Sequence, residues 1–246
     1  MELLNSILVK APSIKVQFEG VQDTVTYKNL NGKNVEVPVY YDTDIVKGNV
    51  IINLNKTKNF EHLGVRVDLN GVIENYRDKR MNSRFISITK DILPPGTLDN
   101  EKTIIGYDFS QFEKLYESYR GVNACVRYFL VVTIASKYKN IVEEKEFFLF
   151  KPFKMLESVD DEGITMEIGI EECLHIHFEV FRSKFHLKDI VEGNVIFKKV
   201  GLRLENMEIQ IVKKETVVTG NNTYTESDII ASFEIMDGAP FKSINY

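Results

Sequence analysis

Apolar and polar residues alternate along most of the chain. The stretches Ile14 to Phe18, Val65 to Leu69 and Ile209 to Val212 each place apolar residues at every second position. A period of two predicts half-buried strands of antiparallel sheets. Sustained helical periodicity is nearly absent, and the one stretch compatible with a turn or two of helix is Gln111 to Tyr119. The sequence therefore predicts an all-β fold.

An internal repeat divides the chain. Residues Asp44 to Ile51 recur as Asp189 to Ile196 with seven of eight positions identical, at an offset of 145 residues. The alternation that begins at Leu63 recurs from Met207 at nearly the same offset. Because the match continues downstream, we interpret it as a duplication and expect two similar β modules in tandem.

The second copy is shorter than the first. From its motif the first module runs 106 residues to Phe150, whereas the second has 57 residues to Tyr246, about 49 fewer. The part without a counterpart contains the most apolar strands of the first module, Val122 to Thr133 and Glu146 to Phe150. We therefore expect exposed sheet edges and half a core in the second module.

Composition and charge exclude several classes of protein. The 246 residues are 43% hydrophobic and 27% charged, which is ordinary for a globular chain. The net charge of −5, with no basic stripe, argues against a nucleic-acid partner. The longest apolar run, Phe129 to Val132, is far shorter than the ~20 residues of a membrane span. The N-terminus lacks the basic region of a signal peptide, so we expect a cytosolic or nuclear protein.

The cysteines and histidines offer the one candidate for metal chemistry. Cys125 and Cys173 are too few for a disulfide framework, and we expect free thiols. Cys173, His175 and His177 alternate on one strand face as metal ligands can, but they spread over about 13 Å. We favour a polar, hydrogen-bonded face and keep a metal site as the alternative. No phosphate loop, nucleophile elbow or zinc-protease helix is present, so neither enzymatic activity nor a cofactor is expected.

Several longer strings resemble one family. They are Phe60 to Val67, Tyr116 to Leu130, Met166 to His175, Ser183 to Asp189 and Glu234 to Pro240. Together they resemble vacuolar protein sorting-associated protein 26, the arrestin-like subunit of the retromer complex. The resemblance implies two arrestin-like β-sandwiches joined by a short linker. It also implies a non-enzymatic adaptor in endosome-to-Golgi retrograde and recycling transport of transmembrane proteins, cytoplasmic and peripheral on the endosomal membrane.

The resemblance further implies partners and a contact site. In the family, the α-solenoid subunit of retromer docks on the second sandwich near Glu234 to Pro240, which makes Ile235 and Met236 its apolar contacts here. The residue pattern agrees, because only one of two adjacent apolar residues on a strand can face the core. Sorting nexins and cargo cytoplasmic tails are the other implied partners, and they bind around the junction of the sandwiches.

The predicted organisation has three parts. They are an N-terminal arrestin-like sandwich at 1–156, an acidic linker at 157–163 and a C-terminal sandwich at 164–246. The last is predicted to be incomplete, because residues after Pro240 do not continue into the family's closing strands. Two other functions remain open: a freestanding arrestin-type cargo adaptor, and a metal-binding β protein that uses Cys173, His175 and His177.

Overall fold

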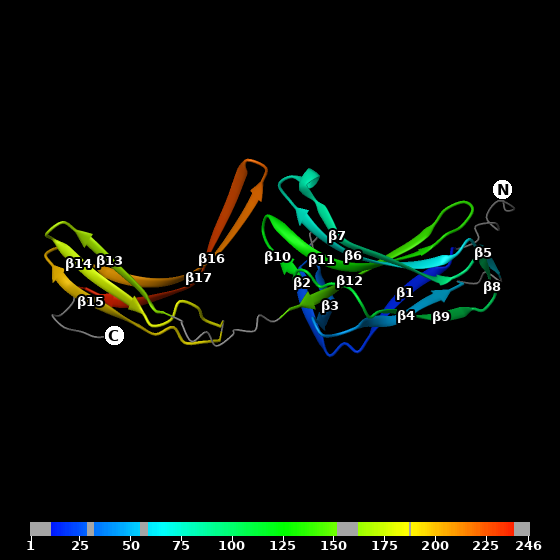
Figure 1. Cartoon of the computed structure of the whole chain (residues 1–246), viewed down its shortest axis with the longest axis horizontal. Coiled ribbons are helices and arrows are strands. Elements are labelled where there is room, and N and C mark those ends of the chain that lie inside the picture. The colour runs from blue at the N-terminus through cyan, green and yellow to red at the C-terminus, as the bar shows by residue number, and fades with distance from the viewer. Residues whose placement is uncertain (1–10, 29–31, 55–58, 152–161, 187, 239–246) are drawn as a thin grey trace, which may run out of the picture. The chain divides into compact units, whose positions relative to one another are not determined.

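Strands make up almost all of the regular structure (Figure 1). The computed structural model describes residues 11–28, 32–54, 59–151, 162–186 and 188–238. Within these ranges the only helix is a single 3-10 turn, η1 (Lys79–Met81), capped by the side chain of Asp78. The predicted all-β class is confirmed. No helix of the described residues is long and apolar enough to cross a membrane.

The chain divides into two compact units. Unit 1 comprises Met1–Pro152 together with Glu215–Tyr224, and unit 2 comprises Phe153–Lys214 together with Thr225–Tyr246. Most of the predicted linker 157–163 lies outside the described residues. The predicted domain boundaries therefore remain a prediction, but the division adds one feature: the tip of a late hairpin belongs to unit 1.

Unit 1 is a β-sandwich. Its sheets have the strand orders β1-β4-β9 and β2-β3-β12-β11-β6-β7, with β10 paired to β11, and a short pair β5-β8. All pairings are antiparallel except β3 with β12. The strands are β1 (Ser13–Glu19), β2 (Asp23–Lys28), β3 (Asn34–Tyr41), β4 (Val46–Asn53), β5 (Phe60–His62), β6 (Val65–Asn75), β7 (Ser83–Leu93), β8 (Gly96–Leu98), β9 (Lys102–Phe109), β10 (Tyr119–Arg120), β11 (Ala124–Ile134) and β12 (Ile141–Phe150).

The core of unit 1 lies between its two main sheets. One sheet contributes side chains such as Val50 and Ile52 of β4, and the other contributes Leu69 of β6 and Leu130 of β11. Strands β4 and β6 bury every second residue where they begin, and runs of three consecutive buried residues occur as well, as at Val50 to Ile52 and Tyr128 to Leu130. Eighteen side chains form this buried cluster among the described residues.

The segment from Gln111 to Tyr119, the one stretch compatible with a turn or two of helix, is not helical. Its residues run without regular structure into β10. Tertiary contacts fix the segment instead: Phe112 packs against the core. The Lys114 ammonium donates to the carbonyls of Asp42 and Asp44 at 2.6 and 2.5 Å. These contacts outweigh a weak local helical preference.

Unit 2 is smaller and has a smaller core. It contains the antiparallel sheet β13-β14-β15 and most of the two-stranded ribbon β16-β17. Only three side chains form its buried apolar cluster in the described residues: Leu174, Ile176 and Val195. The strands are β13 (Ile164–Ile170), β14 (Leu174–Val180), β15 (Gly193–Val200), β16 (Asn206–Thr219) and β17 (Asn222–Asp237).

The aspartate of the internal repeat forms the same turn in both units. The Asp44 carboxylate accepts a hydrogen bond from the Tyr41 N–H at 2.8 Å, and the Asp189 carboxylate accepts one from the His186 N–H at 2.9 Å. In return, the Asp44 N–H donates to the Tyr41 carbonyl and the Asp189 N–H donates to the His186 carbonyl. Both copies therefore make the same side-chain-supported turn before the following strand.

The repeated glycine also has the same role in both units. Gly48 pairs with Phe18 of β1, and Gly193 pairs with Val180 of β14. A Cβ at Gly48 would lie 1.9 Å from the carbonyl oxygen of the residue before its partner, and a Cβ at Gly193 would lie 2.3 Å from the equivalent oxygen. Only glycine permits this close strand approach. The shared geometry supports the duplication inferred from the sequence.

Candidate functional site

The predicted contact residues lie at the end of β17. Ile235 packs against the buried cluster of unit 2, and Met236 is half-buried. The strand ends at Asp237, and Gly238 takes a positive φ of 89° that suits a turn. Both residues of the pair are half-buried, and only Ile235 is in contact with the buried cluster of unit 2. The assignment of the pair as a partner contact stays a prediction.

The histidine face of unit 2 is a hydrogen-bonded cluster centred on a carboxylate. Glu167 of β13 contacts His175 Nε2 and His177 Nδ1 of β14, both at 3.1 Å. The Lys198 ammonium of β15 donates to the same carboxylate at 2.5 Å. These hydrogen bonds, that of Lys198 first, lower the pKa of the Glu167 carboxyl to about 2. Both histidines are therefore already engaged with an ionised carboxylate.

The alternative of a metal site gains no support from this geometry. Cys173 precedes β14 in an exposed turn, where its N–H donates to the Ile170 carbonyl. It does not join His175 and His177 at one point, and within the described ranges no three His, Cys, Asp or Glu side chains are grouped to hold an ion. Both Cys173 and Cys125 are free thiols. The face is best described as a polar ion-pair cluster.

Unit 2 exposes an unusual amount of apolar surface. On β13 the apolar residues Ile164, Met166, Ile168 and Ile170 share one face and are each 43–53% exposed. The ribbon adds Ile209, Ile211, Ile229, Ile230 and Phe233, which are 48–61% exposed. These residues form an exposed apolar surface in the described part of unit 2.

Unit 1 shows what pairs with the equivalent strand edge there. Its strand β6 is paired along its whole length by β11, from Val65 with Ile134 to Asn75 with Ala124. In the repeat β16 takes the place of β6, and among the described residues it pairs only with β17. The expected open edge and half-filled core are thus both present in unit 2.

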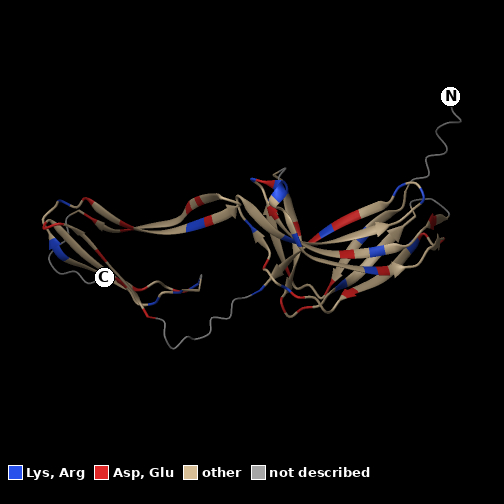
Figure 2. Cartoon of the chain, turned by 45° about the horizontal axis from the view of Figure 1, so that its top comes forward, with Lys and Arg blue, Asp and Glu red and all other residues tan. Residues whose placement is uncertain are grey.

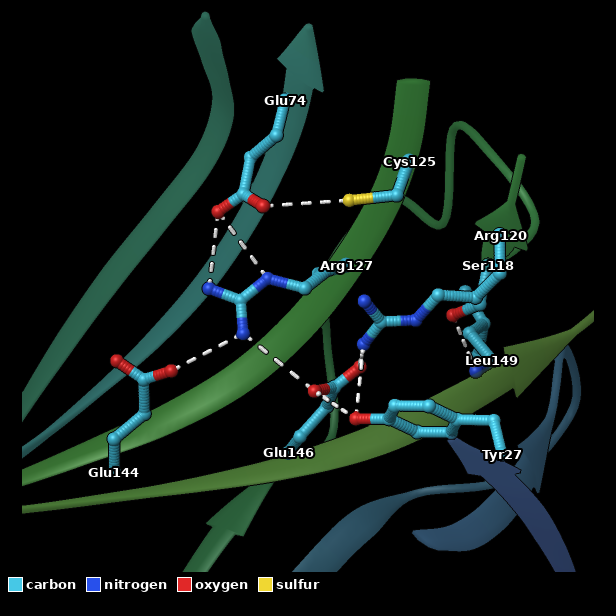
Figure 3. Close-up of polar contacts among 9 residues, drawn as sticks. All are labelled: Tyr27, Glu74, Ser118, Arg120, Cys125, Arg127, Glu144, Glu146 and Leu149. Carbon is cyan, nitrogen blue, oxygen red and sulfur yellow. Dashed lines mark hydrogen bonds and ion pairs between the residues drawn. The ribbon is translucent and has the colours of Figure 1, made fainter. Parts of the chain in front are cut away.

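Unit 1 carries a charged network that sequence reasoning missed (Figure 3). The Arg127 guanidinium on β11 contacts Glu74 of β6 at 3.1 Å and Glu144 of β12 at 3.2 Å. Arg120 contacts Glu146, which also accepts a hydrogen bond from the Tyr27 hydroxyl at 2.9 Å. Burial disfavours the charged Arg127, but the carboxylates outweigh it and raise its pKa. The two arginines are matched by three glutamates, so the network ties four strands together rather than presenting a binding site.

The sequence carried one unused signal for this network. Arg127 interrupts an apolar strand at an outward position, and Glu144 and Glu146 follow with the period of two. Charges at alternating positions of neighbouring strands can pair across a sheet.

A second polar anchor fixes the tip of the β16-β17 hairpin in unit 1. The Glu215 carboxylate accepts hydrogen bonds from the Asn123 N–H at 2.6 Å, the Val122 N–H at 3.0 Å and the Tyr119 hydroxyl at 2.5 Å. A Cβ on Gly121 would lie 1.7 Å from this carboxylate, so the glycine leaves room for it. Glu215 is only 8% exposed.

Comparison with known proteins places these features in context. Residues 9–245 match the family model "Vacuolar protein sorting-associated protein 26". The chain is 40% identical over 221 residues to vacuolar protein sorting-associated protein 26B of Xenopus tropicalis, and it is 40% identical over 219 residues to the human protein of that name. The Dictyostelium discoideum protein 26 is 41% identical over 221 residues. The alignments cover 88–89% of this chain but 62–64% of the relatives, so the chain spans less than two thirds of their length.

Two solved structures that align with most of this chain share little sequence identity with it. Squid arrestin aligns over 86% of this chain and 78% of its own at 11% identity, with a TM-score of 0.40. The sporulation control protein Spo0M of Bacillus subtilis aligns over 89% of this chain and 79% of its own at 9% identity, with a TM-score of 0.41.

Proposed function

The chain belongs to the family of vacuolar protein sorting-associated protein 26, and we propose that it is a non-enzymatic adaptor and scaffold subunit of a retromer-type sorting complex. In this role it works in endosome-to-Golgi retrograde and recycling transport of transmembrane proteins. It is cytoplasmic and associates peripherally with the endosomal membrane. The observation that carries the proposal is the family match over residues 9–245.

The surface of unit 2 supports a scaffold role. Apolar side chains on β13 and on the ribbon are about half exposed, although they are spaced as core residues. Burying an apolar side chain stabilises a protein by about 1.5–3 kcal/mol relative to leaving it exposed. A polypeptide that covers several of them gains a large binding free energy, which suits a subunit built to assemble with other chains.

The α-solenoid subunit of retromer is the partner assigned to the end of β17. Ile235 and Met236 are the proposed contacts, and both are half-buried. Met236 is the one to test, because Ile235 also packs on the unit 2 cluster. Sorting nexins and cargo cytoplasmic tails are the further partners. Nucleic acid is not among them, since the net charge is −5.

Calorimetric titration of the α-solenoid subunit with this chain tests the assignment. Met236→Asp should weaken binding by a factor of about 30 or more, because a charge is then desolvated at an apolar contact. Ile190→Asp is the matched control, since Ile190 is 76% exposed in a loop of unit 2. Substituting Ile235 is avoided because the loss of its core contacts would destabilise unit 2 itself.

Two results would overturn parts of the proposal. Binding that is equally tight for the parent chain and Met236→Asp would remove the end of β17 as the contact. A parent chain that does not bind the α-solenoid subunit, while its circular dichroism shows a folded β protein, would favour the freestanding cargo adaptor.

A further inference from the structure

A polar hollow lies in unit 1 between two loops far apart in sequence. One wall is the connection from β6 to β7, which contains η1, and the other is the tip of the β16-β17 hairpin. The hollow has a volume of about 470 Å³. Its lining includes Arg77, Arg80, Thr219, Asn221, Asn222 and Tyr224.

Hydrogen bonds hold the walls of this hollow in place. The buried Asn75 amide donates to the Thr219 hydroxyl at 2.7 Å and so joins the two loops. Its carbonyl oxygen accepts from the N–H groups of Arg77 and Asp78 at 2.9 and 3.0 Å. The anchor at Glu215 fixes the start of the hairpin tip. A ligand would therefore meet a preorganised site, which reduces the entropy cost of binding.

The connection is basic in an otherwise acidic chain (Figure 2). The connection contains Arg77, Lys79 and Arg80 against the single acid Asp78, a net charge of +2, and Arg84 follows at the start of β7. The Asp78 carboxylate is already used by Arg80, at 2.8 Å from its guanidinium. A local excess of positive charge attracts anionic groups even when the whole chain is negative.

The lining of the hollow offers many hydrogen-bond donors and only one anionic acceptor, the Asp78 carboxylate. Arg80 uses two of its five N–H groups on Asp78, and its side chain is 89% exposed. The amide groups of Asn221 and Asn222 and the hydroxyl of Tyr224 add further donors. Such a set suits the oxygens of an anionic side chain.

A free strand edge begins beside the hollow. Strand β7 is the last strand of its sheet, and within the described part of the chain it pairs only with β6. It starts at Ser83, directly after η1. The outer edge of such a strand has backbone groups that can pair with an extended peptide. A membrane surface has no backbone groups that could pair with a strand edge, so the edge favours a peptide.

From these observations we propose that the hollow binds an acidic peptide segment in an extended conformation, with an anionic side chain between Arg80 and the hairpin tip. The segment continues along the edge of β7. This inference does not depend on the retromer assignment, because it concerns unit 1 and names the chemistry of the peptide alone.

Fluorescence anisotropy with a defined probe tests the inference. The probe is a fluorescein-labelled peptide of alternating glutamate and serine, and its neutral analogue carries glutamine in place of glutamate. The parent chain should bind the acidic peptide and not the analogue, with an affinity that falls as salt is added. Arg80→Glu should weaken binding roughly tenfold or more, because it replaces an attractive charge by a repulsive one.

Matched variants separate a site from a general charge effect. Lys137→Glu makes the same charge change at a residue 66% exposed and paired with Glu61, outside the hollow, and should leave the affinity unchanged. Asn222→Ala removes a donor from the lining without changing the charge and should weaken binding several-fold.

Three outcomes would overturn the inference. They are failure of the parent to bind the acidic peptide, equal losses for Arg80→Glu and Lys137→Glu, and preferential binding to phosphatidylserine vesicles over the peptide. The last would assign the basic connection to a membrane surface.

Discussion

Replacing Glu215 by alanine should release the tip of the β16-β17 hairpin from unit 1. In the wild-type chain the carboxylate accepts three hydrogen bonds, from the backbone of Val122 and Asn123 and from the Tyr119 hydroxyl. Alanine removes all three acceptor contacts at a site that is 8% exposed. The N–H of Asn123, whose residue is fully buried, then has no acceptor.

The magnitude follows from the kind of contact that is lost. A hydrogen bond to a charged group contributes about 1.5–3 kcal/mol, and water can replace the acceptor for the more exposed donors. We expect a loss of about 3 kcal/mol for Glu215→Ala and about 1 kcal/mol for Tyr119→Phe, which removes one donor.

The effect should depend on pH. Burial raises the pKa of Glu215, but the hydrogen bonds from Tyr119 and Asn123 outweigh it and hold the pKa below its usual value. A carboxyl with a lowered pKa contributes stability above its unfolded value of about 4.3, and this contribution is lost as the pH falls through the folded value. The difference between wild type and Glu215→Ala should therefore shrink in acid.

Hydrogen exchange of backbone amides measures this directly. The amides of Asn123 and of residues 216–224 should exchange faster in Glu215→Ala, by a factor that corresponds to the free energy lost. Glu143→Ala, at an exposed position of β12, is the control. Equal exchange in Glu215→Ala and this control would refute the account of the anchor.

Two further predictions concern the repeat and the ion-pair cluster. Gly48→Ala and Gly193→Ala should each destabilise their own unit by several kcal/mol, because the added methyl meets the backbone of the neighbouring strand. Gly106→Ala is the control, because a methyl group has room there. Comparable urea midpoints for all three variants would contradict the reasoning. In NMR titration the Glu167 carboxyl should ionise near pH 2, and Lys198→Met should raise the pKa of Glu167. The ionised Glu167 stabilises the fold above the ordinary pKa of a glutamate, and this stabilisation is lost as the pH falls towards about 2. An unchanged midpoint in Lys198→Met would show that Lys198 does not hold this carboxylate.

Much of the fold follows from the sequence, because period-two alternation is a local signal and the repeat, identical at seven of eight positions, can be read directly from the chain. The repeat predicted a shortage of core in unit 2, which the structure shows, whereas the equivalent turns at Asp44 and Asp189 are a finding of the structure. The stretch from Gln111, although compatible with a short helix, is not helical, since long-range contacts such as those of Lys114 decide the conformation there.

The polar sites were harder to predict. Glu215 meets Asn123 across 92 positions of sequence, and no local pattern marks either residue as a partner. The same holds for the hollow, whose walls come from residues 77–81 and 219–224. The pair Ile235 and Met236 was predicted from a family resemblance, and in the structure both residues are half-buried while Ile235 also packs against the unit 2 cluster.

Size-exclusion chromatography with light scattering, on an equimolar mixture of this chain and the α-solenoid subunit of retromer, tests the central claim most directly. The account predicts a single peak whose mass is the sum of the two chains and which persists at micromolar concentration. Two separate peaks with the masses of the free proteins, at a concentration where each is folded, would contradict the assignment as a retromer subunit.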